Sequence, residues 1–371
     1  MGIVRIQGAI ADYPWGGEGA LSRLLGWSDF DAMEAEWWLG THPLRPSHTH
    51  QGETVSSWLA STGSSPELPY LFKILAPHAP LSLQVHPSSA QAQEGFAREE
   101  ADGVALDAPT RLFKDPHPKP ELVVALGGPF HALAGIRPVD ETISVLESLG
   151  EGSAPISSFV DRLRFEPMGD VISWLLSGGD EVSFLVSELE ARSDGDDTLS
   201  RLVAHYPGDP GIAVAMVMNR VTLLPGESLF LDAGQLHAYL EGFAIELMAP
   251  SDNVLRGGLT SKHVDVPGLL AITDFTPTSP PRLEPAAASG GGVVFAPDGQ
   301  TFALGLVEGS DVNASHAVSG PTVVVCTEGE WVLQGEHNEL PVAHGQAAIV
   351  DASEGRLRLT GTGQLWWAFA D

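Results

Sequence analysis

Four stretches of the sequence carry side chains that could take part in chemistry, and three of them offer metal ligands. In "LSLQVHP" (81–87), Gln84 and His86 are two residues apart and therefore point to the same side of a β-strand. Glu121 opens the apolar run "ELVVAL", where a buried carboxylate needs a partner or a metal. His237 follows two turn signals in "PGESLFLDAGQLHAYL". Two imidazoles, one carboxylate and one amide suit a borderline divalent ion such as Zn²⁺.

The fourth stretch is polar and rich in glycine. "SDNVLRGGLTSK" brings Asp252, Arg256 and Lys262 close together in the chain. The protein has a formal net charge of −29 and only four lysines, three of which lie in or near the four stretches. Basic residues gathered at one place in so acidic a protein indicate a local need for positive charge, such as an anionic substrate, although structural ion pairs also use lysines.

Each ligand candidate also has a simpler interpretation when it is considered alone. His86 could be an ordinary hydrogen-bonded strand histidine, and Gln84 could belong to the solvated face of its strand, opposite Leu81, Leu83 and Val85. Glu121 could be a strand-end carboxylate that is paired with Lys119 nearby in the sequence. The metal-site interpretation therefore requires that the separate stretches converge in the fold.

The spacing of apolar residues along the chain predicts a mainly β protein with one helical part. Short alternating segments separated by Gly and Pro fill residues 1–137 and return in 209–278, and they are typical of β-sandwiches or jelly rolls. Residues 138–208 show the helical spacing of three to four and are predicted to be a helical insertion. Residues 279–371 begin with a linker rich in Pro, Ala, Ser and Gly and continue as a C-terminal β domain.

The composition excludes several classes of function. The charge of −29 opposes binding to nucleic acid or to an anionic membrane. No apolar run is long enough to cross a bilayer, and the first residues do not form an export signal. The single cysteine, Cys326, fits a reducing compartment. We therefore expect a cytoplasmic protein, monomeric or weakly homo-oligomeric, whose partner is a small molecule.

Several motifs together resemble the type I mannose-6-phosphate isomerases, which are zinc enzymes with cupin-type β-barrels. The resemblance covers most of the chain and lies in "YPWGG", "AEWWLGTHP", "LSLQVHP", "KPELVVAL" and "LHAYLEGFAIELMAPSDNVLRGGLTSKHVDV". It implies cupin-type jelly-roll barrels, one catalytic and one C-terminal, with an inserted helical domain. It also implies one zinc ion per chain, bound by Gln84, His86, Glu121 and His237.

The resemblance extends to residues around the metal. Arg256 matches the active-site arginine of the family, and Ser82 and Lys262 match residues that contact the phosphate or hydroxyls of the substrate. We assign Lys119 and Asp252 to substrate binding as well. The sequence departs from the family in "DPHPKPE", where Pro118 stands directly before Lys119 in place of a histidine. A catalytic role of that histidine therefore cannot be transferred to His117, one position earlier.

The predicted reaction interconverts mannose 6-phosphate and fructose 6-phosphate through an enediol or enediolate. A zinc ion would polarise substrate oxygen, and Arg256 would support the developing negative charge. The proton-transferring group stays open among Lys119, Asp252, Glu246 and a zinc-bound water. Two alternatives are a cupin dioxygenase, against which the amide ligand Gln84 argues, and a non-catalytic sugar-binding cupin protein, which has no obvious need for the polar stretch at 251–262.

Overall fold

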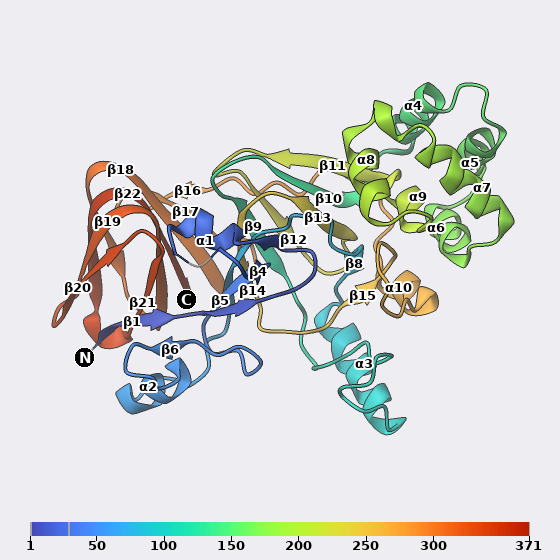
Figure 1. Ribbon diagram of the computed structural model, residues 1–371. Helices are drawn as coiled ribbons and strands as arrows, with labels where there is room; N and C mark the ends of the chain where they lie inside the picture. Colours follow the sequence, from blue (N-terminus) through green and yellow to red (C-terminus); the bar gives the residue numbers. More distant parts are fainter. Residues whose placement is uncertain (1, 29, 371) are drawn as a thin grey trace.

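The structure, a computed structural model, describes residues 2–28 and 30–370 and consists mostly of antiparallel β-sheet, with one large group of helices at one end (Figure 1). The prediction of a mainly β protein is confirmed at this level. A five-stranded sheet carries much of the candidate site. In spatial order its strands are β11 (Met218–Leu223), β10 (Phe130–Ile136), β13 (His237–Glu241), β8 (Gln84–Val85) and β15 (Leu255–Arg256).

A six-stranded sheet contributes buried charged residues to the candidate site. Its strands, in spatial order, are β12 (Ser228–Leu231), β9 (Glu121–Ala125), β14 (Ala244–Met248), β7 (Leu71–Leu75), β5 (Glu36–Leu39) and β2 (Ala9–Ala11). Val123 and Ala125 of this sheet share a buried cluster with Phe130 and Tyr239 of the five-stranded sheet. Because side chains alternate along a strand, Glu121 lies on the same face as Val123, toward the five-stranded sheet. Strands β3 (Gly17–Glu18) and β4 (Met33–Glu34) form a separate pair.

A nine-stranded sheet built largely from the C-terminal part packs on the six-stranded sheet. Its main path is β16 (Ala286–Ala287), β17 (Val293–Phe295), β18 (Phe302–Ala317), β22 (Arg356–Ala370), β19 (Thr322–Gln334), β21 (Gln346–Val350), β1 (Ile3–Gln7) and β6 (His48–Thr49), and β20 (Glu339–Ala343) pairs with β19. Phe72 and Leu122 of the six-stranded sheet share a buried cluster with Phe295 and Trp366. The N-terminal strand β1 thus lies in the sheet of the C-terminal part, which the sequence pattern did not indicate.

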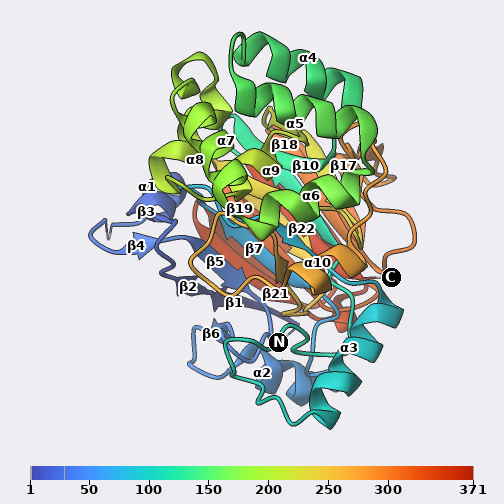
Figure 2. The same ribbon diagram turned by 90° about the vertical axis from the view of Figure 1, so that its right-hand side faces the viewer.

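Between β10 and β11 the chain forms a group of helices next to the five-stranded sheet (Figures 1 and 2). They are α4 (Val139–Leu149), α5 (Ala154–Phe165), α6 (Met168–Ser177), α7 (Asp180–Glu190), the short 3₁₀ helix η1 (Ser193–Gly195), α8 (Asp197–His205) and α9 (Gly211–Ala215). The last of them lies beyond residue 208, where the sequence pattern placed the end of the helical part. The remaining helices are α1 (Ala20–Leu25), α2 (Val55–Thr62), α3 (Ser89–Ala101), α10 (Val266–Ile272) and η2 (Ala352–Glu354).

The apolar residues of "LSLQVHP" pack on two different sides. Leu83 and Val85 are buried in a large cluster together with the helices that follow β10, as the alternation predicts. Leu81 instead packs against the cluster between the five- and six-stranded sheets. The regular strand begins only at Gln84, so the alternation does not reach back to Leu81.

Tyr70 connects the six-stranded and nine-stranded sheets, and its removal provides a test of that contact. Its hydroxyl donates to the carbonyl oxygen of Ala368 at 2.8 Å, and the side chain is 1% exposed. We expect Tyr70→Phe to lower the free energy of unfolding by about 1–2 kcal/mol, because the buried carbonyl loses its donor. Urea denaturation measures this change. An unchanged midpoint would show that the hydroxyl does not stabilise the contact.

Candidate metal centre and active site

Glu121, at the start of β9, is a buried carboxylate surrounded by polar groups from both sheets. Its Oε1 atom lies 3.1 Å from Nε2 of His86 and accepts a hydrogen bond from Nζ of Lys119 at 2.6 Å. Its Oε2 atom lies 3.4 Å from Nε2 of His237 and accepts a hydrogen bond from the Tyr239 hydroxyl at 3.1 Å. The structure therefore brings three of the predicted metal ligands together.

Backbone carbonyl groups fix the orientation of both imidazole rings. Nδ1 of His86 lies 2.7 Å from the carbonyl oxygen of Asn253, and Nδ1 of His237 lies 2.9 Å from that of Gln235. A carbonyl oxygen can only accept, so Nδ1 is the donor in each ring. Each Nε2 atom is thereby directed at Glu121, in the arrangement that metal-binding histidines commonly show.

Electrostatics favour the ligand form of these side chains. Burial, together with nearby Lys119, lowers the pKa of His86 to about 4. Burial alone would raise the pKa of Glu121, but Lys119 and His86 outweigh it and hold that pKa well below its usual range. At neutral pH a neutral imidazole therefore faces an ionised carboxylate, and these are the protonation states that bind a divalent metal.

The geometry passes a direct test of fit for a metal ion. Nε2 of His86 is fully buried and makes no hydrogen bond within the part of the chain that the structure describes. With its proton on Nδ1, this nitrogen points a lone pair at an anionic oxygen, so two acceptors face each other with no proton between them. One donor atom from each of His86, Glu121 and His237 lies within 4.8 Å of the others. Two imidazoles and one carboxylate are a typical donor set for catalytic zinc.

Strand pairing places Gln84 beside this group. Gln84 is directly opposite His237 on one side and Arg256 on the other in the five-stranded sheet. Residues opposite each other in antiparallel strands project to the same face. Gln84 therefore shares a face with a ligand candidate and with the predicted active-site arginine, in a position to add an amide oxygen.

A pocket of about 500 Å³ opens next to the metal-ligand group. Gln84 and Lys119, the neighbours of His237 and Glu121, line it, so the pocket borders the buried carboxylate. Every residue that the sequence assigned to substrate or catalysis contributes to its wall, namely Ser82, Lys119, Asp252, Arg256 and Lys262. Other residues of the wall include Trp38, Lys73, Tyr206, Thr260 and Ser261.

Two cations of the pocket are close together and lack acidic partners. Burial lowers the pKa of Arg256, and burial and the charge of Arg256 lower that of Lys262. Among the described residues, neither side chain forms an ion pair with a carboxylate. Two neighbouring unpaired cations in a protein of charge −29 form a site for an anion.

This chain is similar in sequence and in fold to mannose-6-phosphate isomerases. The family profile described as "Phosphomannose isomerase type I, catalytic domain" matches residues 3–139. The mannose-6-phosphate isomerase of Salmonella typhimurium is 35% identical over 97% of this chain and 98% of its own. The chain belongs to the type I phosphomannose isomerase family. A crystal structure of the Salmonella typhimurium enzyme, bound to substrate and zinc, superimposes over 100% of both chains with a TM-score of 0.90 and 33% identity. The human mannose-6-phosphate isomerase is 32% identical over 73% of each chain.

Membership of the phosphomannose isomerase family confirms the resemblance seen in the sequence. The sequence did not, however, indicate the roles of two residues that contact the site. Tyr239 is one of them, because a tyrosine on an apolar strand is usually a core residue. Asn253 is another. Its side chain, fully buried, accepts from the backbone N–H of Lys114 at 2.6 Å and donates to the carbonyl oxygen of His117 at 2.8 Å. Asn253 therefore ties the segment before Glu121 to the polar stretch at 251–262.

The structure also shows where the histidines near the unusual "DPHPKPE" segment and near Asp252 lie. His117 is exposed and is not among the residues that line the pocket, so it does not take the place of a histidine at position 118. His42, which the sequence did not single out, is buried with Nε2 3.6 Å from the Asp252 carboxylate. The nearest imidazole partner of Asp252 thus comes from a different part of the chain.

The lowered pKa of His86 gives a testable dependence of stability on pH. Between pH 6.5 and about 4, the unfolded chain binds a proton at His86 that the folded, metal-free protein does not. The free energy of unfolding of the metal-free protein should therefore fall as the pH decreases through this range. His86→Gln should weaken that dependence in urea denaturation, whereas His50→Gln, at an exposed histidine, should not. Equal slopes for all three proteins would contradict the assignment.

Proposed function

We propose that this pocket interconverts mannose 6-phosphate and fructose 6-phosphate with one zinc ion bound by Gln84, His86, Glu121 and His237. The observation that carries the proposal is the buried carboxylate that faces an imidazole lone pair at the edge of a pocket with two unpaired cations. The predicted isomerase reaction and the zinc cofactor are both confirmed by relatives that carry this activity in their names and by a related structure with substrate and zinc. The dioxygenase and the non-catalytic sugar-binding protein are not favoured.

The protein holds the metal ligands rigidly. Zinc, when bound, supplies a Lewis acid that polarises substrate oxygen. Lys119 and Tyr239 each donate a hydrogen bond to Glu121, which fixes both carboxylate oxygens. The carbonyl groups of Asn253 and Gln235 fix the imidazoles from the other side. Such outer contacts orient ligands and contribute to metal affinity.

Substrate charge is matched by the two unpaired cations. Lys262 and Ser82 bind the phosphate group, and Arg256 stabilises negative charge that develops on the sugar oxygens. Arg256 is next to Gln84 on the strand pair, so its guanidinium projects from the same face as the metal ligands. One cation thus serves the reacting end of the sugar, and the other serves the phosphate end.

Burial and pocket lining reduce the number of side chains that are candidates for proton transfer. Glu246 is 4% exposed, pairs with Lys73 at 3.1 Å and does not line the pocket, so it is held in the scaffold. Lys119 and Asp252 do line the pocket. Nζ of Lys119 is bound to the Glu121 carboxylate, whereas Asp252 is exposed and faces His42. Both therefore stay candidates, Lys119 beside the metal ligands and Asp252 at an exposed position of the pocket wall.

The finer description of the fold is part of the same proposal. The five- and six-stranded sheets, which enclose one apolar cluster, support a cupin-type jelly-roll barrel, and the nine-stranded sheet supports a second. Helices α4–α9 support an inserted helical domain. The boundaries 1–137, 138–208, 209–278 and 279–371 stay predictions, as do the cytoplasmic location and a monomeric or weakly oligomeric state. None of the described helices is long and apolar enough to span a bilayer.

Metal removal tests the zinc assignment. We expect a chelator to abolish isomerisation of mannose 6-phosphate, and stoichiometric Zn²⁺ to restore it. Glu121→Gln should lose zinc in metal analysis and stay inactive after zinc is added, because the amide removes the anionic ligand. Glu227→Gln, at a partly exposed, ion-paired glutamate, is the matched control. Activity that persists in metal-free protein would contradict the mechanism, and oxygen consumption with iron would favour a dioxygenase.

A pair of substitutions separates the roles of the two unpaired cations. Arg256→Ala should lower kcat by about 100-fold or more, because the lost charge stabilises the transition state. Lys262→Ala should mainly raise KM for mannose 6-phosphate, by about tenfold, because it removes a phosphate contact. Arg282→Ala, at an arginine paired with Glu227, should change neither constant. Steady-state kinetics of the three zinc-loaded variants measure these constants. A normal kcat for Arg256→Ala would show that Arg256 does not stabilise the transition state.

A further inference from the structure

The turn between α8 and α9 binds the loop that carries Lys262. Oδ1 of Asp209, in this turn, accepts hydrogen bonds from the backbone N–H of Gly211 at 2.7 Å and of Leu259 at 3.0 Å. Its Oδ2 atom accepts one from the backbone N–H of Thr260 at 3.2 Å. One carboxylate of the helical part thus holds two consecutive peptide groups of the polar stretch at 251–262.

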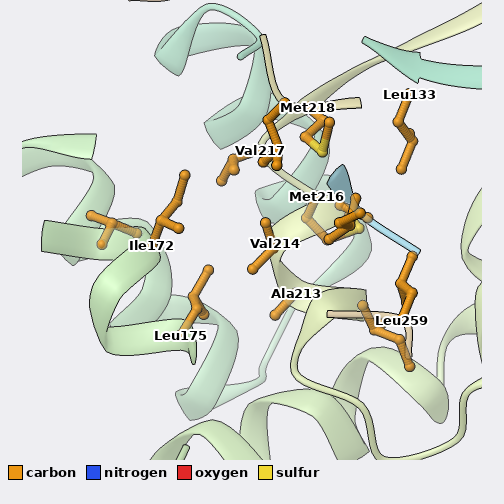
Figure 3. Packing of buried hydrophobic residues seen from close by; sticks show 14 of the residues in the cluster. Leu133, Ile172, Leu175, Ala213, Val214, Met216, Val217, Met218 and Leu259 are labelled. Carbon is orange, nitrogen blue, oxygen red and sulfur yellow. The ribbon is translucent and has the colours of Figure 1, made fainter. Parts of the chain in front are cut away.

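The held loop has an unusual backbone conformation. Leu259 has φ of 52°, in the left-handed region that L-residues other than glycine rarely adopt. Its side chain is fully buried in the apolar cluster beside the helices, where it lies near Ala213 and Met216 (Figure 3). Such a conformation persists only when its surroundings enforce it, and strained residues concentrate at functional sites.

The two segments are also in direct backbone contact. A Cβ atom built on Gly258 would lie 2.7 Å from Cα of Gly211, and one built on Gly211 would lie 2.7 Å from the backbone nitrogen of Leu259. Any larger residue at either position would push the loop away from the turn. The hydrogen bonds of Asp209 therefore act across a contact with no space for adjustment.

The loop from Leu259 to Lys262 forms a wall of the pocket. Thr260, Ser261 and Lys262 line it, and Oγ1 of Thr260 accepts a hydrogen bond from the backbone N–H of Lys262 at 3.0 Å. The same turn also contacts the neighbouring segment that carries Ser82, because the Tyr206 hydroxyl donates to the carbonyl oxygen of Pro80 at 2.7 Å, two residues before Ser82. The α8–α9 turn therefore contacts both segments that we assign to phosphate binding.

We propose that Asp209 is a positioning residue for the substrate phosphate. It does not line the pocket itself, and it acts by fixing the backbone of Leu259 and Thr260 so that Lys262 is held at the phosphate end of the pocket. This role rests on the proposed function, since it assumes that Lys262 binds the phosphate. It assigns to the helical part a function in substrate affinity rather than in chemistry.

The experiment compares zinc-loaded Asp209→Ala and Asp209→Asn with the unaltered protein. Asp209→Ala should raise KM for mannose 6-phosphate by about tenfold, which corresponds to ~1.4 kcal/mol, and leave kcat within about twofold. Asp209→Asn keeps one oxygen for Gly211 and Leu259 and should restore part of the affinity. Inorganic phosphate should raise the Tm of the unaltered protein and do so much less for Asp209→Ala.

Asp351→Ala is the matched control. Asp351 is also a buried carboxylate that accepts a backbone N–H, from Ser353 at 2.9 Å, but it is not among the residues that line the pocket. Its removal should lower Tm without changing KM or the effect of phosphate on Tm. If Asp209→Ala does not fold, Asp209→Asn takes its place, and its KM should still exceed that of the unaltered protein because an amide nitrogen cannot accept the N–H of Thr260.

The outcomes separate this inference from the function on which it rests. If Lys262→Ala raises KM while Asp209→Ala, or Asp209→Asn in its place, leaves KM and the phosphate effect unchanged, the positioning role is overturned and the isomerase function stands. A rise in KM for Asp351→Ala equal to that for Asp209→Ala would also overturn it, because loss of stability would then explain the effect. If Lys262→Ala leaves KM unchanged, the phosphate assignment fails, and the positioning role fails with it.

Discussion

Nε2 of a neutral, buried imidazole and an ionised carboxylate oxygen lie 3.1 Å apart with no proton between them, and the rest of the site is organised around this contact. Two facing acceptors in a region from which water is excluded are unfavourable unless a cation is bound there. The ring of His86 cannot turn away, because Nδ1 is held by the carbonyl group of Asn253. Glu121 cannot turn away either, because Lys119 and Tyr239 hold its two oxygens. The polar contacts thus maintain a geometry that a bound metal ion makes favourable at neutral pH.

Two sheets are needed to build this contact. Gln84, His237 and Arg256 project from neighbouring strands of the five-stranded sheet, whereas Glu121 comes from the six-stranded sheet opposite. A shift of one residue in the register of β8 would turn Gln84 away from the site. The large apolar clusters on both sides of these sheets fix the register, and the metal ligands depend on it. The nine-stranded sheet contributes by covering the outer face of the six-stranded sheet.

The local sequence pattern was sufficient to predict part of the arrangement of the metal ligands. The two-residue spacing of Gln84 and His86 predicts their common face, and the positions of Glu121 at a strand start and His237 after two turns made them candidate partners. The resemblance to the family then grouped the four residues into one zinc site. The alternation failed at Leu81, where the chain precedes the regular strand. The pairing of β1 with β21, and the hydrogen bonds of Asp209 to the loop at Leu259, connect residues far apart in the chain. Hydrophobic periodicity reports only which face of an element is buried, and it contains no information about which distant element covers that face.

Some basic side chains near the site are paired with carboxylates and others are not, and this difference leaves positive charge available for an anionic sugar in a strongly acidic chain. Lys73 is buried between Glu36 at 3.5 Å and Glu246 at 3.1 Å, and Lys119 is bound to Glu121. Those lysines are neutralised within the fold, where an unpaired charge would be costly. Lys262 lies in the partly open wall of the pocket next to Arg256, where hydration makes the absence of a carboxylate tolerable.

The scarce lysines of this chain therefore serve two different uses of positive charge. Lys73 and Lys119 balance buried carboxylates and give the scaffold its fixed geometry. Lys262, together with Arg256, keeps its charge available for a ligand. An added carboxylate near this pair would neutralise it and remove the local positive potential that the net charge of −29 otherwise opposes. The loop that carries Lys262 is accordingly held through backbone N–H groups, by a carboxylate of the helical part that does not line the pocket.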